Sequence, residues 1–331
     1  MTSSTLHFLR PHFLRNGLLN LAYRALPALL VVALLVPVAS VQAETTETIL
    51  IRQALEKDRS GRRRGDVELA LSAYDRDRVV IYDAGGSIDG RGWSVRFSSR
   101  DDMASALKAD LSVRRYDVKR EVIFIGVWKN KAFVTTLDVG QVIDGGTGAR
   151  APYSQRRLWT FHKLDEKWLV TGAIVDLGDI DGGPTDGRVE AADVARAVQD
   201  HAAQWNAGNH SGILAGVTEN VVITDAYLSS NPALWVIIFG DREEFDEWLG
   251  DRLKNVTYAI ESTILHAVAK GDEAVAVSRQ RITATYASGE ARIVEDRYNT
   301  WLLTRASGSW LVDWAWWKTT PDSTPQAIAP H

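Results

Sequence analysis

Carboxylates and histidines are the side chains of this cysteine-free sequence that could do acid–base chemistry. Asp83 and Asp225 each end a β-branched run that follows an amphipathic segment and a glycine, and His201 lies in the second of those segments, before Gly208. A carboxylate becomes a useful general base when apolar surroundings raise its pKa, and an imidazole can donate a hydrogen bond to a ligand oxygen. An aspartate after a strand can equally cap a turn, and a helix-flank histidine can be satisfied by water, so both interpretations stay open.

Other catalytic sets are missing from the sequence. There is no cysteine in the 331 residues, which excludes a disulfide framework, a thiol nucleophile and a thiolate metal site. The histidines His162, His201, His210 and His266 are too scattered to form a helical metal pair. No phosphate-binding glycine loop and no Ser/His/Asp set stands out. We therefore expect neither a metal nor a cofactor.

The two aspartates belong to an internal repeat. An offset of 142 residues carries Val80 onto Val222 and Asp83 onto Asp225. The same offset relates Phe97 to Phe239, Leu107 to Leu249, Tyr116 to Tyr258, Trp159 to Trp301 and Trp168 to Trp310. Two copies of about 140 residues each match the usual size of a domain, so the repeat predicts a duplicated domain.

Each copy is expected to be an α+β domain in which helices come first and a meander of strands follows. In copy one we predict a helix over 46–64 ended by Gly65, a short helix capped by Asp66, a strand over 79–82, and a helix that begins at the capping box 99–102. The apolar period then changes to two. The predicted antiparallel strands are 116–127, 131–141, 154–162 and 167–175, repeated in copy two as 256–269, 273–287, 292–304 and 309–319.

Residues 1–43 have the pattern of an export signal. Three arginines precede the apolar run 25–39, and Val41-Gln42-Ala43 is a small-x-small cleavage pattern. The run is shorter than the roughly 20 residues of a spanning helix, so we predict cleavage after Ala43, a periplasmic or secreted protein, and no stable membrane insertion after cleavage. The predicted domains are copy one over 44–178, an acidic Gly-rich linker over 179–191, copy two over 192–320, and a disordered tail over 321–331.

The charges and aromatics predict that the two copies dock on each other. Residues 44–178 carry 23 basic and 20 acidic residues, whereas residues 179–331 carry 12 and 22. These opposite signs favour docking between the copies and do not suggest a nucleic-acid partner. Alternation along the last strand places Trp310, Trp314 and Trp316 on one face and Trp317 on the other. We expect the other copy to cover the three indoles in an intramolecular pseudo-dimer, with ligand stacking as the alternative.

The order of helix, glycine, short helix, strand, helix and meander, with the phrase Trp205-Asn206-Ala207-Gly208-Asn209, resembles the nuclear transport factor 2-like superfamily. The SnoaL-like polyketide cyclases and the ketosteroid isomerases belong to it. The resemblance covers nearly all of the chain after residue 43, twice. It implies two tandem cone-shaped domains, each a strongly curved antiparallel sheet around the first helix with an apolar pocket. It specifies fold rather than function, because the superfamily includes several enzyme types and silent binding modules.

The resemblance also implies roles for individual residues. The isomerase general base is an aspartate just after the first strand, where this sequence has Asp83 and Asp225. The oxyanion tyrosine seven residues before the helix-ending glycine is replaced by Asp58 in copy one and His201 in copy two. The position of the second oxyanion acid falls near Leu158 and Thr300, which are not acids. Steroid isomerase chemistry is therefore not expected.

We expect an exported protein that binds a small apolar or aromatic molecule. Its candidate ligand-binding residues are Trp205, Tyr227, Tyr82 and Tyr74. One alternative is a lyase, isomerase or cyclase in which Asp225, or Asp83 in copy one, is the base and His201 assists. A second alternative is a non-catalytic scaffold in which side chains fill both pockets.

Overall fold

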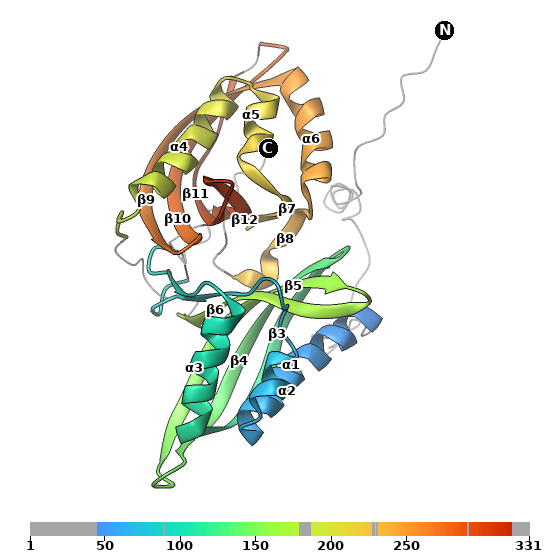
Figure 1. Ribbon diagram of the computed structural model, residues 1–331. Coiled ribbons are helices and arrows are strands. Elements are labelled where there is room, and N and C mark those ends of the chain that lie inside the picture. The colour runs from blue at the N-terminus through green and yellow to red at the C-terminus, as the bar shows by residue number, and fades with distance from the viewer. Residues whose placement is uncertain are drawn as a thin grey trace, which may run out of the picture. The chain divides into compact units, whose positions relative to one another are not determined.

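The computed structural model describes residues 45–88, 90–178, 187–226, 229, 231–289 and 291–319. The predicted export signal, the predicted tail and residues 179–186 of the predicted linker lie outside these residues. Within the described part, no helix is both long and apolar enough to cross a membrane. The described chain forms two copies of one arrangement, each with three α-helices and a six-stranded sheet (Figure 1). The tandem α+β architecture expected from the sequence is confirmed.

Copy one places its helices before and beside a meander. Its strand order is β2-β1-β6-β5-β4-β3, with β1 parallel to β6 and the other neighbours antiparallel. The helices are α1 (Thr46–Arg64), α2 (Val67–Leu71) and α3 (Arg100–Val113), and the strands are β1 (Val80–Asp83), β2 (Ser94–Phe97), β3 (Arg114–Trp128), β4 (Lys131–Asp144), β5 (Arg150–Leu164) and β6 (Lys167–Leu177).

Copy two repeats this topology with the strand order β8-β7-β12-β11-β10-β9. A 3-10 turn, η1 (Pro232–Leu234), precedes its second strand. The helices are α4 (Ala192–Asn206), α5 (His210–Ala215) and α6 (Arg242–Asn255), and the strands are β7 (Val217–Asp225), β8 (Val236–Phe239), β9 (Val256–Lys270), β10 (Glu273–Tyr286), β11 (Ala291–Ala306) and β12 (Ser309–Thr319).

The predicted helix ends agree with the caps in the structure. Gly65 ends α1 in the left-handed conformation with φ 71°, which a residue without Cβ adopts at no steric cost. The Ser99 and Asp241 side chains accept hydrogen bonds from the third residue of α3 and α6, respectively. The short strands β2 and β8 were not predicted, because each has only four residues.

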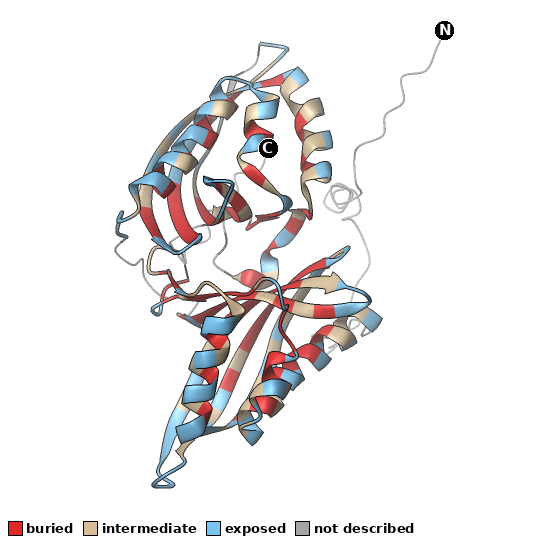
Figure 2. Cartoon of the chain, viewed as in Figure 1, coloured by how far each residue is buried: buried red, intermediate tan, exposed pale blue. Residues whose placement is uncertain are grey.

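Each copy has its own apolar core between its helices and the concave side of its sheet (Figure 2). Helix α1 contributes Ile51 and Leu55 to the first core, and α4 contributes Val194 and Val198 to the second. These positions follow helical spacing, so one stripe of each helix is buried while the opposite face is exposed. The first helix of each copy thereby sets the position of the side chains that face the inside of its cone.

A third buried cluster contains residues of both copies. It includes Trp93 and Phe133 from copy one and Trp235, Trp314 and Trp316 from copy two. The ring centroids of Trp93 and Trp316 lie 5.9 Å apart, and those of Trp235 and Phe133 lie 6.4 Å apart. Aromatic pairs at such separations add to the stabilisation gained from burial.

The predicted face assignment on the last strand was partly wrong. The pairing of β12 with β7 shifts register between Val312 and Trp314, so the alternation of side chains is interrupted at this bulge. As a result, Trp310 and Trp317 lie in the core of copy two, whereas Trp314 and Trp316 lie in the third cluster. A register shift of this kind leaves no mark in a simple pattern of alternating residues.

Candidate functional site

The cone of copy two encloses a cavity of about 210 Å³ with aromatic walls. Trp205 comes from α4, Trp248 from α6, Tyr258 from β9, Trp301 from β11 and Trp317 from β12. The ring centroid of Trp205 lies 5.3 Å from that of Tyr258 and 6.2 Å from that of Trp248. Elements from the whole length of the copy therefore build one aromatic lining. His201, Asp225, Arg252, Gln280, Arg297 and Lys318 are the polar residues of this lining.

His201 is held between two of these indoles. Its ring centroid lies 6.5 Å from that of Trp205 and 6.0 Å from that of Trp301, and the residue is 7% exposed. Burial lowers the pKa of His201 to about 4, so its ring is neutral at pH 7. The indole N–H of Trp205 donates to His201 Nε2 at 3.2 Å, which assigns the ring proton to Nδ1.

The second ring nitrogen of His201 lies against Gly216. A Cβ built on Gly216, which does not line the cavity, would stand 2.6 Å from Nδ1. Among the described residues, Nδ1 has no hydrogen-bond partner. With one nitrogen bonded to Trp205 and the other against the Gly216 backbone, His201 acts on the position of Trp205 rather than on a bound molecule.

Asp225 lies in the same cavity lining as His201, as the sequence suggested, and is 8% exposed. Its Oδ2 is 3.0 Å from the Nζ of Lys318, so the carboxylate is part of an ion pair. Two further cations lie on the wall. Arg252 donates from Nε to the Tyr258 hydroxyl at 2.6 Å, and the Arg297 guanidinium stands 5.5 Å from the ring centroid of Trp317. The cavity thus combines flat apolar surfaces with polar groups that can bond a substituent.

The cone of copy one encloses a cavity of about 270 Å³ with a different lining. Four arginines and one aspartate face it: Arg62, Arg96, Arg114, Arg157 and Asp110. The expectation of an apolar pocket in each copy is therefore wrong for copy one. Its apolar wall is smaller and includes Phe97, Met103 and Leu107.

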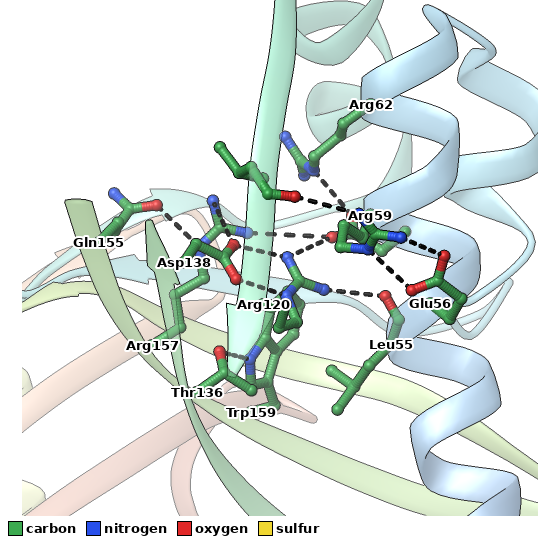
Figure 3. A network of polar contacts seen from close by, with 12 residues as sticks. Leu55, Glu56, Arg59, Arg62, Arg120, Thr136, Asp138, Gln155, Arg157 and Trp159 are labelled. Carbon is green, nitrogen blue, oxygen red and sulfur yellow. Dashed lines mark hydrogen bonds and ion pairs between the residues drawn. The ribbon is translucent and has the colours of Figure 1, made fainter. Parts of the chain in front are cut away.

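A buried ionic network stands behind this cavity (Figure 3). Asp58, which is 0% exposed, accepts from Arg62 Nε at 2.8 Å and from Arg120 Nη2 at 3.0 Å. Asp138 binds Arg120 through both carboxylate oxygens, at 2.7 Å each. Arg157 Nη1 completes the cluster 3.9 Å from Asp58. Burial alone raises the pKa of Asp58, but Arg62, Arg120 and Arg157 outweigh it and hold that pKa well below its usual range.

Asp58, which replaces the oxyanion tyrosine implied by the resemblance, does not take over its role as a donor. Tyr74 donates from its hydroxyl to Asp58 Oδ1 at 2.9 Å, so Asp58 is an acceptor in this contact. The carboxylate is ionised and saturated by cations, and it cannot donate to a ligand oxygen.

The two cavities differ because the same positions carry different side chains. Within the first helices the offset is 143, so Asp58 and Arg62 correspond to His201 and Trp205. The ion pair of copy one, one helical turn apart, becomes an indole–imidazole hydrogen bond in copy two. At the offset of 142, Ala106 corresponds to Trp248, Arg120 to Ser262, Asp138 to Gln280, Arg157 to Asn299 and Val175 to Trp317. Copy two has thus exchanged charges for aromatic and neutral polar groups.

The remaining predicted residues lie in separate places. Asp83 is absent from the lining of the copy-one cavity and accepts from the Gly85 N–H at 3.0 Å, which is the turn-capping alternative. Tyr82 is buried in the third cluster, away from either cone. Tyr74 lines the copy-one cavity, and Trp205 lines that of copy two. Tyr227 lies outside the described residues.

The arginine network was missed by sequence reasoning. Its members come from α1, β3, β4 and β5, so no local motif joins them. The available signal was the comparison of the copies. Arg120, Asp138 and Arg157 are charged where copy two has the neutral Ser262, Gln280 and Asn299, inside strands that otherwise match.

Comparisons with solved structures find proteins that are similar to about 40% of this chain. The chain is similar to a ketosteroid isomerase-like protein from Erwinia carotovora atroseptica, with 19% identity and a TM-score of 0.33 over 40% of this chain and 95% of that one. It is similar to an NTF-2 like protein of unknown function from Shewanella oneidensis, with 16% identity and a TM-score of 0.32 over 39% and 98%.

A third similar structure is a putative aromatic ring hydroxylase from Novosphingobium aromaticivorans, with 11% identity and a TM-score of 0.32 over 39% of this chain and 87% of that one. At these identities and TM-scores no role is carried over from these proteins to this chain. No family model and no curated protein matches the chain.

Proposed function

We propose that this chain is an exported protein whose second copy binds a small aromatic molecule. The observation that carries the proposal is the set of indoles around an open cavity, where Trp205, Trp248 and Trp317 replace Arg62, Ala106 and Val175 of copy one. Flat aromatic side chains gain about 0.5–1.5 kcal/mol per ring pair beyond area burial, which favours an aromatic occupant. The proposal of export is based on the signal pattern of residues 1–43. N-terminal sequencing of the secreted product tests it, and Glu44 should be the first residue.

The cavity limits the size and polarity of the ligand. A dry cavity of about 150 Å³ accepts benzene. The volume of about 210 Å³ in copy two therefore suits one aromatic ring or two fused rings. Arg252, Arg297 and Lys318 on the same wall favour a ligand with a hydroxyl or another oxygen substituent.

Binding is favoured over catalysis because of the state of His201. A lyase or isomerase mechanism with Asp225 as base needs His201 to reach the substrate. Its Nε2 accepts from Trp205, and its Nδ1 lies against Gly216. The scaffold alternative requires filled cones, whereas each copy contains a cavity.

Calorimetric titration with 2-naphthol tests the proposal, with cyclohexanol as an apolar probe that lacks an aromatic ring. We expect 2-naphthol to bind and cyclohexanol to bind at least about tenfold more weakly, since only the former stacks on indoles. Trp248→Ala should weaken 2-naphthol binding by at least about tenfold. Trp310→Phe is the matched control, because Trp310 is a core indole of the same copy that does not line the cavity. Equal effects of the two variants would contradict the proposal.

We also propose that the two copies form an intramolecular pseudo-dimer. Trp93 and Trp235 are equivalent residues, and their indole N–H groups donate to the equivalent carbonyl oxygens of Ser87 and Ser229 at 3.0 and 2.7 Å. Each indole packs on the other copy, Trp93 on Trp316 and Trp235 on Phe133. Such reciprocal contacts are typical of a two-fold interface. Small-angle scattering should therefore give the radius of one compact particle at all concentrations.

A further inference from the structure

The arginine-lined cavity of copy one has no role in the binding proposed for copy two. We propose that it is a second ligand site, which binds a small organic monocarboxylate with the carboxylate facing Arg62 and Arg157. The site would give one chain two pockets of different chemistry, one anion-selective and one aromatic. The inference is independent of the proposal for copy two, because it uses other residues in the other domain.

The first argument is the charge of the buried network. Among the described residues, the three guanidinium groups of Arg62, Arg120 and Arg157 meet the two carboxylates of Asp58 and Asp138. All five side chains are at most 18% exposed. The neighbouring Arg59 and Glu56 pair with each other at 2.7 Å and leave this balance unchanged. A surplus positive charge with little access to water is unfavourable, and a bound anion of charge −1 neutralises it.

The second argument is that two of the guanidinium groups that carry the surplus positive charge line the copy-one cavity. Arg62 and Arg157 belong both to the network and to the cavity lining, whereas Arg120, Asp58 and Asp138 stand behind it. A ligand in the cavity can therefore contact the guanidinium groups of Arg62 and Arg157, whereas Asp58 and Asp138 are not part of the lining. Figure 3 shows Arg120, Asp138 and Arg157 between α1 and the sheet, joined by ion pairs.

Two further arginines strengthen the positive field of the lining. Arg96 and Arg114 have side chains 51% and 57% exposed, and each also has an acidic neighbour. Asp83 lies 3.9 Å from Arg96, and Asp110 lies 3.3 Å from Arg114. The long-range attraction of Arg96 and Arg114 for an anion guides it toward the buried arginines of the lining. This attraction weakens as the salt concentration rises.

The apolar part of the lining distinguishes an organic acid from an inorganic ion. Phe97, Met103 and Leu107 form one wall, and the rings of Tyr116 and Tyr153 lie edge to face at 5.5 Å. Phosphate would leave these surfaces in contact with water. A planar carboxylate fits the fork of a guanidinium, while its hydrocarbon body covers the apolar wall. A cavity of about 270 Å³ admits an acid of the size of benzoate.

Copy two supplies an internal control for this assignment. At the positions of Arg62 and Arg157 it has Trp205 and Asn299, and Asn299 donates to Gln280 at 2.7 Å. Both members of that pair are neutral, so the pair itself buries no charge. Arg157→Asn therefore gives copy one a side chain that the same fold already accommodates at that position.

The test is calorimetric titration of the whole chain with benzoate, benzamide and inorganic phosphate. We expect benzoate to bind at least about tenfold more tightly than its neutral analogue benzamide and than phosphate. Arg157→Asn and Arg62→Gln should each weaken benzoate binding by at least about tenfold. Arg63→Gln is the matched control, because Arg63 follows Arg62 directly, has a 60% exposed side chain and does not line the cavity. Its benzoate affinity should change less than about twofold.

A variant at two exposed positions keeps the test decisive if a variant at a buried position does not fold. If circular dichroism shows that a buried variant is unfolded, Arg96→Gln combined with Arg114→Gln replaces it, and we expect at least about threefold weaker benzoate binding and a smaller salt dependence. The inference is overturned if benzamide or phosphate binds as tightly as benzoate, or if folded arginine variants retain full affinity. Trp248→Ala separates the two sites: benzoate binding should persist in this variant, and its loss there would place benzoate in copy two and overturn the inference.

Discussion

The indole N–H of Trp205 donates to Nε2 of His201 across one turn of α4, at 3.2 Å. In copy one, the equivalent turn of α1 holds the ion pair of Arg62 and Asp58 at 2.8 Å. A single backbone geometry thus supports an aromatic wall in one cone and a cationic wall in the other. This exchange is the basis of the two proposed sites.

His201 should make copy two sensitive to acid. Its pKa is about 4 in the folded chain, below the ordinary value of 6.5, so the folded state binds fewer protons between these values. The contribution of His201 to stability is complete above pH 6.5 and is lost as the pH falls toward 4. Urea unfolding should show that His201→Gln loses less stability than the wild type between about pH 7 and about pH 4.5, by up to about 3 kcal/mol.

His210→Gln is the control for this prediction. The His210 side chain is 43% exposed, lies 2.8 Å from Asp246 and does not line the copy-two cavity. Its replacement leaves the buried ring of His201 in place, so the loss of stability toward acid that comes from His201 should remain. If the His201→Gln variant and the wild type had the same pH dependence of stability, this would contradict the account of a buried neutral imidazole.

Asp58→Asn should be one of the most destabilising single substitutions in copy one. It leaves the guanidinium groups of Arg62, Arg120 and Arg157 against Asp138 alone, so the buried surplus grows from one charge to two. The expected loss is about 3–5 kcal/mol in the free energy of unfolding. Adding Arg157→Asn to this variant removes one positive charge and should restore part of the loss, which a double-mutant cycle by urea unfolding measures.

An exposed ion pair provides the comparison. Asp117 has a 59% exposed side chain and lies 3.7 Å from Arg63, so Asp117→Asn should change stability by no more than about 0.5 kcal/mol. Additive losses in the double variant of Asp58 and Arg157 would show that their charges do not interact as described.

Gly61→Ala should destabilise the chain, although alanine is the better helix former. A Cβ at Gly61 in α1 would meet the Cα of Ala70 in α2 at 2.7 Å, and that neighbour is backbone that cannot rotate away. We expect a loss of about 1–3 kcal/mol from overpacking. Gly250 in α6 is the control, because the nearest atom to its added Cβ is 3.8 Å away. Gly250→Ala should stabilise by up to about 1 kcal/mol in thermal or urea unfolding. Equal signs for the two substitutions would argue against close packing of α1 on α2.

Much of the fold was predictable because the duplication repeats the apolar positions and caps of each element. The helix Thr46–Arg64 has the predicted bounds, since Gly65 ends it by a local mechanism. The face of Trp310 was not predictable, because the bulge before Trp314 depends on the pairing of β12 with β7. Local patterns carry no information about such a register shift.

The candidate site was predictable only in part. His201, Trp205 and Asp225 line one cavity because the first helix and the first and last strands converge inside the cone. The partners of His201 could not be inferred, since Gly216 approaches its Nδ1 only after the sheet has formed. The arginine network depends on pairing between Arg120, Asp138 and Arg157 on neighbouring strands, and sequence distance hides such contacts.

The most direct test of the aromatic site in copy two is the indole N–H NMR spectrum of the chain during titration with 2-naphthol. The 12 tryptophans give separate probes, which single Trp→Phe variants assign. The account predicts shifts of the Trp205, Trp248 and Trp317 signals, with those of Trp168 in copy one and Trp310 outside the cavity unchanged. Binding of 2-naphthol without shifts of these three signals would contradict the assignment of the site to the cone of copy two.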